Sequence, residues 1–500
     1  MPRSVLAIDQ GTTNTKAVLV SETGDVLATA SRPVPIRYPQ PGWVEQDAVE
    51  LWRSVLDAAA ECLAKAGCAA PDAIGISNQR ESAIAWDRRS GMPVGPGVSW
   101  QCRRTAPFCA ELRRNGHEPM LVERTGLAVD PVCSAGKMRW LLEHTPDGCR
   151  RAANGEIALG TVDSWLLWNL TGGAAHACDL TNASRTQLLN LHRLSWDSEL
   201  LALFGIPEAA LPALGESSHI YGETALCGAI PAGIPIGALA GDSHAALFGH
   251  AIFTPGAVKA TYGTGSSLMT LTHAPSWSHG LATTVAWSRR GDIRFGLEGN
   301  IFATGGAVQW IGEFLGLPNA AADAAKLAAT VSDTAGVYLV PAFAGLGAPY
   351  WNDASRGTLS GLSRGTSAAH AARAAVEAIA FQISDVFQAM EAAAHQPIPE
   401  LLADGGATHN EFLMQFQADI LDRTVVASGD ADVSAIGAAW LAGLATGVWK
   451  SLDALAAFAG TARRFEPSMD PARRERLLCG WRGAVRQALA AASNPPEMEK

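Results

Sequence analysis

Charged residues are scarce in this chain, and the positive ones are outnumbered. Asp, Glu, Lys and Arg make up only 17% of 500 residues, and 38 Lys plus Arg against 48 Asp plus Glu give a formal net charge of −10. Such a chain has no general attraction for nucleic-acid phosphates or an anionic membrane, so both kinds of partner are disfavoured. A hydrophobic share of 48% also argues against extensive disorder.

Cysteine is too sparsely placed to build a disulfide framework or a zinc site. The nine cysteines run from Cys62 to Cys479 without a Cys-x-x-Cys pair and without a Cys/His cluster at zinc-ligand spacing. We therefore expect reduced thiols, most of them buried.

A long unbroken apolar segment is also missing. Residues 224–241 are uncharged, but Pro231, Pro235 and several glycines would break a helix exposed to lipid. The first residues reach Asp9 before the apolar region of a signal peptide has room to form. We expect a cytoplasmic protein with no membrane partner.

The chain is long enough for more than one domain, and the order of its expected elements indicates the fold. Three short β-rich segments separated by turn residues predict a meander, and an amphipathic helix follows, with Asp47 and Glu50 in the spacing of a capping box. The strands are expected at residues 5–9, 16–20, 26–30 and, after the helix, 74–77. This order is typical of a ribonuclease-H-like α/β fold.

The pattern partly recurs in the second half. Residues 236–240 and 257–261 are again expected strands that end at glycine-containing turns, and a long Ala-rich helix is expected over residues 367–394. Together they predict a duplicated, two-lobed fold with lobes at residues 1–250 and 251–500 and an interlobe cleft.

Two turns have the composition of a phosphate cradle. Residues 9–13 place an acid at a strand end, then a glycine and two threonines, and residues 263–265 read Gly-Thr-Gly. Neither is a Walker loop, because no Gly-Lys-Ser/Thr closes it. The alternative is an ordinary turn whose hydroxyls bond to their own backbone.

Residues 404–410 form a third candidate turn, between an expected strand at 401–403 and an expected helix at 411–421. The glycine pair in this turn allows a planar ring or a phosphate to touch the backbone. A structural turn is the alternative here as well.

A further group of residues suits a small hydroxylated ligand. Residues 78–81 and 100–104 combine guanidinium, carboxylate and amide groups with an indole, although a surface salt-bridge network is the alternative. Asp242 follows an apolar strand, where a carboxylate is either a helix N-cap or a base. His244 is a rival base, with a structural histidine as the simpler interpretation. An interlobe cleft explains these features together better than unrelated turns do.

The motifs, in this order, make the chain similar to the FGGY carbohydrate kinases of the actin/Hsp70/sugar-kinase superfamily, and within them to the glycerol kinases. The resemblance covers nearly the whole chain. It rests on residues 8–13, 41–45, 77–81, 100–104, 160–163, 181–186, 262–265, 345–351 and 404–406.

The resemblance implies transfer of a phosphoryl group from ATP, with Mg²⁺, to a hydroxyl of a small polyol or sugar. It implies Asp242 as the general base and Asp9 as the residue that positions Mg²⁺ through water. The implied substrate-binding residues are Arg80, Glu81, Trp100 and Asp242. The implied nucleotide-binding residues are Thr12, Thr13, Lys16, Thr264, Gly305, Gln309, Gly406 and Asn410.

Three departures fall in the implied substrate pocket. The chain has Val132 where glycerol kinases generally carry Tyr, Ser243 where they carry Gln, and Ser267 where they carry Phe. Each change removes volume, so we expect a larger pocket and a four- or five-carbon polyol or ketose as a rival to glycerol. The loop at residues 228–233 lacks a Gly-Gly-Thr-Arg pattern, so feedback by fructose 1,6-bisphosphate is not expected.

Glycerol itself stays an alternative acceptor, and a nucleotide switch of the actin/Hsp70 type is an alternative from another class. The group formed by Arg80, Glu81 and Trp100 argues against the switch, which has no need of a polyol pocket. The sequence does not determine the oligomeric state, and a homodimer stays open.

Overall fold

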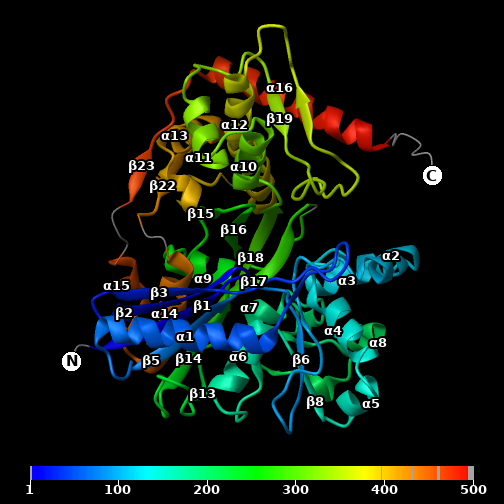
Figure 1. Cartoon of the computed structure of the whole chain (residues 1–500), viewed down its shortest axis with the longest axis vertical. Helices are drawn as coiled ribbons and strands as arrows, with labels where there is room; N and C mark the ends of the chain where they lie inside the picture. The colour runs from blue at the N-terminus through cyan, green and yellow to red at the C-terminus, as the bar shows by residue number, and fades with distance from the viewer. Residues whose placement is uncertain (1–2, 279, 396, 430–431, 459–461, 494–500) are drawn as a thin grey trace.

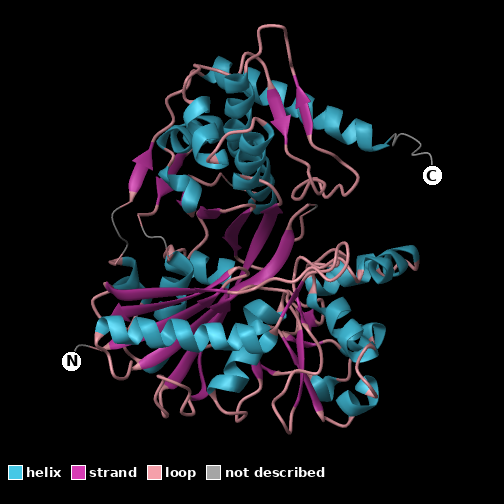
Figure 2. Cartoon of the chain, viewed as in Figure 1, coloured by secondary structure: helices cyan, strands magenta, loops and turns pink. Residues whose placement is uncertain are grey.

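The computed structural model describes residues 3–278, 280–395, 397–429, 432–458 and 462–493. Helices and strands alternate along the chain, and each half contains one large mixed sheet (Figures 1 and 2). No helix in these ranges is both long and apolar enough to cross a lipid bilayer. All nine cysteines are unpaired, and five of them are buried.

The first half contains a six-stranded sheet in the order β13-β14-β5-β1-β2-β3. Its strands are β1 Ser4–Gln10, β2 Asn14–Ser21, β3 Val26–Pro33, β5 Ala73–Asn78, β13 Ser218–Glu223 and β14 Pro235–Gly241. Strand β1 pairs antiparallel with β2 and parallel with β5, and β14 pairs parallel with β5. The predicted meander and the strand after the helix are therefore confirmed.

Strand β1 is apolar on both faces because both faces are covered. Leu6 and Ile8 pack with helix α1 (Ala48–Ala66), whereas Val5 and Ala7 pack with helix α14 (Val433–Thr446). A strand buried on both faces reads as a continuous apolar run. Helix α1 begins where the sequence predicts, since the carboxylate of Asp47 accepts from the backbone N–H groups of Val49 and Glu50.

The second half contains a seven-stranded sheet in the order β17-β18-β16-β15-β21-β22-β23. Its strands are β15 Ala257–Tyr262, β16 Ser266–Thr272, β17 Ala282–Arg289, β18 Asp292–Ile301, β21 Glu400–Asp404, β22 Thr424–Ala427 and β23 Arg463–Phe465. Strand β15 pairs antiparallel with β16 and parallel with β21, as β1 does with β2 and β5. The central pairing of the first sheet is thus repeated in the second.

Smaller elements complete the described part of the chain. Five two-stranded ribbons are β4 Glu45–Gln46 with β7 Gly97–Val98, β6 Ile84–Asp87 with β8 Ile157–Gly160, β9 Ala177–Asp179 with β12 Ala213–Gly215, β10 Leu189–Asn190 with β11 Ser195–Trp196, and β19 Tyr338–Val340 with β20 Thr358–Ser360. The other helices are α2 Ala106–Arg114, α3 Glu118–Thr125, α4 Ser134–Glu143, α5 Gly148–Ala153, α6 Val162–Leu170, α7 Leu180–Ala183, α8 Ser198–Phe204, α9 Asp242–Gly249, α10 Gly305–Phe314, α11 Ala320–Ala328, α12 Ala368–Ala394, α13 Glu411–Leu421, α15 Leu452–Ala456 and α16 Pro471–Ser493.

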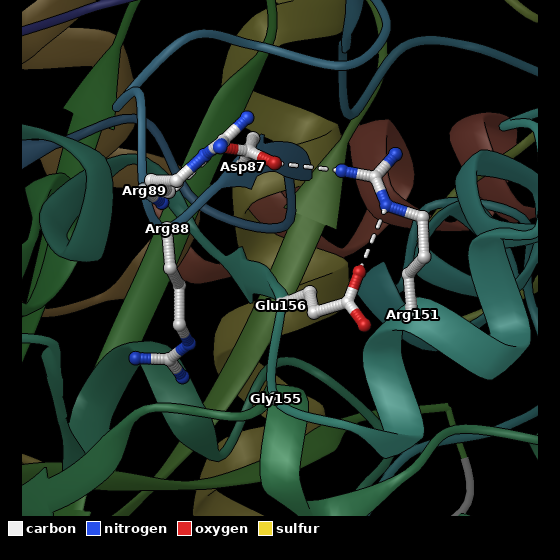
Figure 3. Close-up of a pocket in the computed structure, with 6 residues that line it drawn as sticks. All are labelled: Asp87, Arg88, Arg89, Arg151, Gly155 and Glu156. Carbon is white, nitrogen blue, oxygen red and sulfur yellow. Dashed lines mark hydrogen bonds and ion pairs between the residues drawn. The ribbon is translucent and has the colours of Figure 1, made fainter.

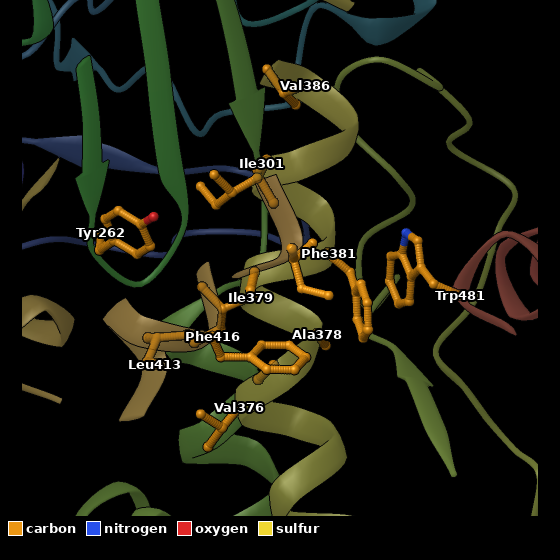
Figure 4. Close-up of a cluster of buried hydrophobic side chains, with 14 of the residues drawn as sticks. Tyr262, Ile301, Val376, Ala378, Ile379, Phe381, Val386, Leu413, Phe416 and Trp481 are labelled. Atoms are coloured by element: carbon orange, nitrogen blue, oxygen red, sulfur yellow. The ribbon is translucent and has the colours of Figure 1, made fainter. Parts of the chain in front are cut away.

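Helix α12 lies at the centre of the second half (Figure 4). It begins after Ser367, whose backbone N–H donates to His370 Nδ1 at 3.0 Å, and its predicted apolar face is buried. The Phe381 ring stacks on Trp481 at 5.3 Å between centroids and meets Phe416 edge-on at 5.6 Å. These aromatic contacts tie α12 to α13 and α16 and form the core beneath the second sheet.

The two halves interlock through helices α9 and α14. A Cβ added to Gly437 of α14 would lie 1.8 Å from the carbonyl oxygen of Ala245 in α9, and one added to Gly75 of β5 would lie 2.2 Å from the carbonyl oxygen of Ala438. Only glycine permits such close approach. A helix late in the chain therefore packs on the first sheet, and the division at residue 250 stays a prediction.

His176, a partly buried histidine in the first half, has two hydrogen-bond partners that require a neutral ring. His176 bonds the carbonyl oxygen of Leu159 through Nε2 at 2.9 Å and contacts Arg88 Nη2 through Nδ1 at 2.8 Å. Because arginine only donates, Nδ1 accepts and the ring is neutral. Burial and the Arg88 charge lower the pKa of His176 to about 4.

We predict that this site destabilises the fold in mild acid. The unfolded chain binds a proton on His176 near pH 6.5, whereas the folded chain does so near 4, so its contribution is complete above 6.5 and is lost as the pH falls towards 4. Between pH 7 and pH 5 the parent should lose on the order of 1–2 kcal/mol more than His176→Gln in urea unfolding. Equal losses in the two proteins, with exposed His219→Gln as the control, would contradict the assignment.

Candidate active site

The candidate site forms where three parallel strands end. Strands β1, β5 and β14 lie side by side, and their carboxyl ends meet at one edge of the first sheet, with Gln10 and Gly241 both opposite Asn78. At this edge Ser77 Oγ donates to Asp9 Oδ1 at 2.8 Å. The predicted residues Asp9 and Asp242 are thus brought to the same edge of the sheet.

Asp242 is held by two donors on one of its oxygens. Arg80 Nε donates to Asp242 Oδ1 at 3.0 Å, and the backbone N–H of Ser243 donates to the same oxygen at 2.6 Å. In the described part of the chain no hydrogen bond or ion pair reaches Oδ2, and the side chain is 38% exposed. One carboxylate oxygen is fixed and the other is free to face a ligand.

The interpretation of Asp242 as a helix N-cap is wrong. Helix α9 has Gly241 as its N-cap, and Asp242 is the first helical residue. The neighbouring His244 is buried, and its Nε2 lies 3.0 Å from the hydroxyl of Thr284. Burial and the charge of Arg80 hold the pKa of His244 well below its ordinary value, so the ring stays neutral.

The first predicted phosphate turn is a tight hairpin between β1 and β2. The backbone N–H of Gly11 donates to the carbonyl oxygen of Asn14 at 2.9 Å. The threonine hydroxyls are not bonded to their own backbone, contrary to the alternative for this turn: Thr12 Oγ1 accepts from Trp100 Nε1 at 2.9 Å, and Thr13 Oγ1 accepts from Asn14 Nδ2 at 3.1 Å. The indole predicted to bind substrate therefore touches the turn predicted to bind phosphate.

Lys16, on β2, reaches the second half of the chain. Its Nζ lies 2.7 Å from Asp432 Oδ1, directly before helix α14. Although burial opposes it, this contact raises the pKa of Lys16, so the ammonium stays charged.

Two of the predicted nucleotide residues of the second half, Thr264 and Gly305, lie at the β15–β16 turn. The backbone N–H of Gly305 donates to the carbonyl oxygen of Gly263 at 3.1 Å, and that of Gly306 donates to Thr264 at 2.9 Å. Gly405 has φ 97°, and a Cβ there would lie 2.4 Å from the carbonyl oxygen of Tyr262. The turn before η2 (Gly406–His409) thus packs against the end of β15.

The other predicted nucleotide residues, Gly406, Asn410 and Gln309, lie outside the β15–β16 turn. A Cβ on Gly406 would meet nothing within 4 Å, so this backbone faces open space. Asn410 caps α13 by accepting from the backbone N–H of Leu413 at 3.1 Å. Gln309, on α10, donates to Glu313 at 2.6 Å on the protein surface.

Arg80 and Glu81 belong to a buried charge cluster that includes two residues missed by the sequence analysis. Arg80 contacts Glu298 as well as Asp242, and Arg185 bonds Glu81 at 2.6 Å and lies 3.1 Å from Glu298. All four side chains are at most 8% exposed, so a surface salt-bridge network is excluded. Glu298 gives a weak sequence signal, an acid between apolar and glycine residues in the interior of β18.

The three departures from the glycerol-kinase pattern surround this cluster. Ser243 Oγ donates to Ser267 Oγ at 3.0 Å, and Ser267 Oγ donates to Glu298 at 3.1 Å. The carbonyl oxygen of Val132 accepts from Lys137 Nζ, which also bonds the carbonyl oxygen of Glu81 at 3.2 Å. The structure therefore brings Val132, Ser243 and Ser267 close to the predicted substrate-binding pair.

Asp9 has the chemistry of a weak metal ligand. Burial, followed by the nearby charge of Asp242, raises the pKa of Asp9 to about 6, while Ser77 and Lys16 oppose the rise. No group of three or more His, Cys, Asp or Glu side chains is placed to hold a metal among the described residues. One carboxylate with waters and phosphate oxygens is an ordinary Mg²⁺ environment, so Asp9 fits a water-mediated role.

A separate hollow of about 630 Å³ contains none of the predicted site residues (Figure 3). Its walls are formed by Asp87, Arg88, Arg89, Arg151, Gly155 and Glu156. Arg151 is paired with Asp87 at 2.7 Å and with Glu156 at 3.5 Å, so its charge is already balanced. We do not assign this hollow to the candidate site.

Comparison with known proteins places these features in a family. Residues 4–249 match the FGGY family of carbohydrate kinases, N-terminal domain, and residues 258–446 match the C-terminal domain of that family. A glycerol kinase of Stenotrophomonas maltophilia (strain R551-3) is 48% identical over 494 residues, covering 98% of this chain and 99% of the relative. Glycerol kinase 2 of Thermotoga maritima is 47% identical over 489 residues, covering 97% of this chain and 98% of the relative.

A solved structure agrees with the fold. The crystal structure of Plasmodium falciparum glycerol kinase with ADP superposes with a TM-score of 0.91 at 30% identity, over 98% of each chain. The predicted two-lobed α/β fold is confirmed.

Proposed function

The chain belongs to the FGGY family of carbohydrate kinases, and we propose that Asp242 is the base with which it activates a hydroxyl of a small polyol or sugar. Membership of this family makes it an ATP-dependent kinase that phosphorylates an alcohol group. The observation that carries the proposal is the 3.0 Å contact between Arg80 and Asp242, beside a buried polar cluster. A nucleotide-switch function is set aside.

The base has the geometry that proton removal needs. A hydroxyl is a poor nucleophile until a carboxylate accepts its proton, and the free Oδ2 of Asp242 is the oxygen available to do so. The hydroxyl oxygen then bonds to the γ-phosphorus, the bond from that phosphorus to the β-γ bridging oxygen breaks, and ADP leaves. Arg80 keeps Oδ1 in place during this transfer and offsets the charge of the carboxylate.

The phosphate groups of ATP would lie between the two glycine-rich turns. We assign Thr12, Thr13 and Lys16 to the first side, and Thr264, Gly305, Gln309, Gly406 and Asn410 to the second. Asp9 would hold Mg²⁺ through water, and the bound ion would offset negative charge on the phosphate oxygens. Lys16 has three N–H donors, so it could bond a phosphate oxygen as well as Asp432.

The acceptor is the finer part of the proposal. Val132, Ser243 and Ser267 are smaller than the residues expected in a glycerol kinase, and two of them supply hydroxyls beside Arg80 and Glu81. We therefore assign a four- or five-carbon polyol or ketose as the preferred acceptor. Glycerol is the second candidate, favoured by the names of the relatives at 47–48% identity. We place the reaction in the cytoplasm, and a homodimer is the assembly to test.

The base assignment predicts a selective loss of turnover. Asp242→Asn removes the proton acceptor but keeps the side-chain volume, so turnover should fall by about 10²-fold or more while the KM for ATP stays within about twofold. A coupled ADP-release assay measures both. Asp292→Asn, an exposed position on β18, is the matched control and should behave as the parent. Turnover of the Asp242 variant within a few-fold of the parent would remove it from this role.

The pocket assignment predicts a change of acceptor preference. The combined change Val132→Tyr, Ser243→Gln and Ser267→Phe should raise kcat/KM for glycerol and lower it for the longer acceptor. Because each pocket contact is worth roughly 1–3 kcal/mol, the ratio should move by at least about tenfold.

The same assay across glycerol, C4 and C5 polyols and ketoses decides the parent's preference. If the parent prefers glycerol over every longer compound, the argument for an enlarged pocket is wrong and glycerol is the acceptor. Thermal melting of the triple variant shows whether the added volume is tolerated.

A further inference from the structure

Four charged side chains form a ring at the candidate site, in which three links are ion pairs and the fourth is the backbone that joins Arg80 to Glu81. In order around the ring they are Arg80, Glu298, Arg185 and Glu81, with positive and negative charges alternating. Glu298 lies between the two guanidiniums, Arg185 Nε bonds Glu81 at 2.6 Å, and Arg80 and Glu81 are neighbours in the chain. Glu298 lies on β18 in the second half, whereas the other three residues belong to the first half.

The four side chains of the ring are buried, but Asp242, which Arg80 contacts, is not. Glu298 is fully buried, and Arg80, Glu81 and Arg185 are each at least nine-tenths buried. Asp242, which Arg80 contacts from the open side, is 38% exposed. Buried ion networks contribute little to stability compared with apolar packing, so stability alone is a weak reason for four charges here.

Two further features indicate that the ring has a role beyond packing. Arg185 Nη1 and His244 Nδ1 are buried without a hydrogen-bond partner in the described part of the chain, which leaves polar capacity inside the cluster. Glu81 has φ 62°, a conformation that non-glycine residues seldom adopt, and Ser134 Oγ and Lys137 Nζ hold its carbonyl oxygen at 3.1 and 3.2 Å. Such strain persists where the surroundings enforce it, often at functional sites.

We propose that Glu298 and Arg185 are positioning residues for the phosphoryl-transfer reaction: Glu298 fixes the Arg80 guanidinium that orients Asp242, and Arg185 fixes Glu81. This inference rests on the proposed function, because it concerns how the base and the acceptor-binding pair are held. Since Glu298 comes from the second half, the base is correctly oriented only while the two halves are in contact at the ring.

The charges support this arrangement. Although burial opposes ionisation, Arg80 and Arg185 hold the pKa of Glu298 well below its ordinary value. The carboxylate therefore stays charged and forms ion pairs with both guanidiniums. Its replacement by an uncharged amide would leave Arg80 with Asp242 as its remaining close carboxylate and would let the guanidinium turn.

The test is a steady-state comparison of Glu298→Gln with the parent, using the preferred acceptor from the polyol and ketose panel. We expect kcat/KM for the acceptor to fall at least about tenfold, with a lower kcat because the base is misoriented and a higher KM because Arg80 also binds the acceptor, while the KM for ATP stays within about twofold. Glu377→Gln is the matched control, because Glu377 is also a buried carboxylate paired with an arginine, Arg373 at 2.8 Å, but lies in α12 outside the candidate site. It should change the melting temperature without changing either KM.

A second variant, Arg185→Lys, tests the proposal if Glu298→Gln does not fold. Arg185→Lys keeps a positive charge but lacks the planar fork that reaches two carboxylates, so it should shift the acceptor KM in the same direction. The double variant Glu298→Gln with Arg185→Lys should show less than the product of the two single effects, because both break one ring. If both single variants keep the acceptor kcat and KM within twofold of the parent while their melting temperatures fall, the proposal is wrong and the ring is a structural ion network.

A separate measurement distinguishes this proposal from the choice of acceptor. ATP hydrolysis without acceptor uses water as the nucleophile, so Asp242 positioning is tested even if no panel compound is phosphorylated. If the parent uses no panel compound, the assigned acceptor class is wrong, and a tenfold or larger drop of hydrolysis in Glu298→Gln, with Asp242→Asn as the floor, still supports positioning. Hydrolysis equal to that of the parent contradicts it.

Discussion

Two arginines withdrawn from water impose the constraint on which the candidate site depends. A buried guanidinium must be paired, and Arg80 and Arg185 find their carboxylates in three separate elements: Glu81 after β5, Asp242 at the start of α9 and Glu298 on β18. Two of these elements are in the first half and one is in the second. The pairing requirement therefore fixes the second sheet against the first at the point where the chemistry is assigned.

Close backbone contacts between α9, α14 and β5 also hold the candidate site in place. Helix α9 begins with Asp242, and its carbonyl oxygen at Ala245 lies against Gly437 of α14, which in turn lies on Gly75 of β5 through Ala438. A side chain at Gly437 or Gly75 would push α9 or α14 away from the sheet. The position of Asp242 thus depends on the close backbone packing of α9 against α14, as well as on its contact with Arg80.

Local pattern was enough to predict the main strands and helices that carry the candidate site. Five of the six strands of the first sheet and the capped start of α1 follow from apolar runs and a capping residue, and the same runs placed Asp9 and Asp242 at strand ends. Arg185 and Glu298 were missed because their partners lie about a hundred residues or more away in sequence. Asp242 was a candidate cap because sequence does not tell a capping side chain from the first helical residue after a glycine.

The side-chain size of Ser243 and Ser267 cannot be changed without changing the hydrogen bonds that these residues make to charged groups. Ser267 donates to Glu298, the carboxylate that holds Arg80, and Ser243 connects Ser267 to Lys259, a fully buried ammonium whose Nζ lies 3.3 Å from Ser243 Oγ. A larger residue at position 243 or 267 changes the room for an acceptor and also removes a hydroxyl from this chain. Ser243 and Ser267 therefore have two parts in the proposed function: their small size is the basis for proposing a longer acceptor, and their hydroxyls connect Lys259 to Glu298, which contacts Arg80. For this reason acceptor preference has to be judged from the ratio of two acceptors on one protein, since absolute rates respond to both effects.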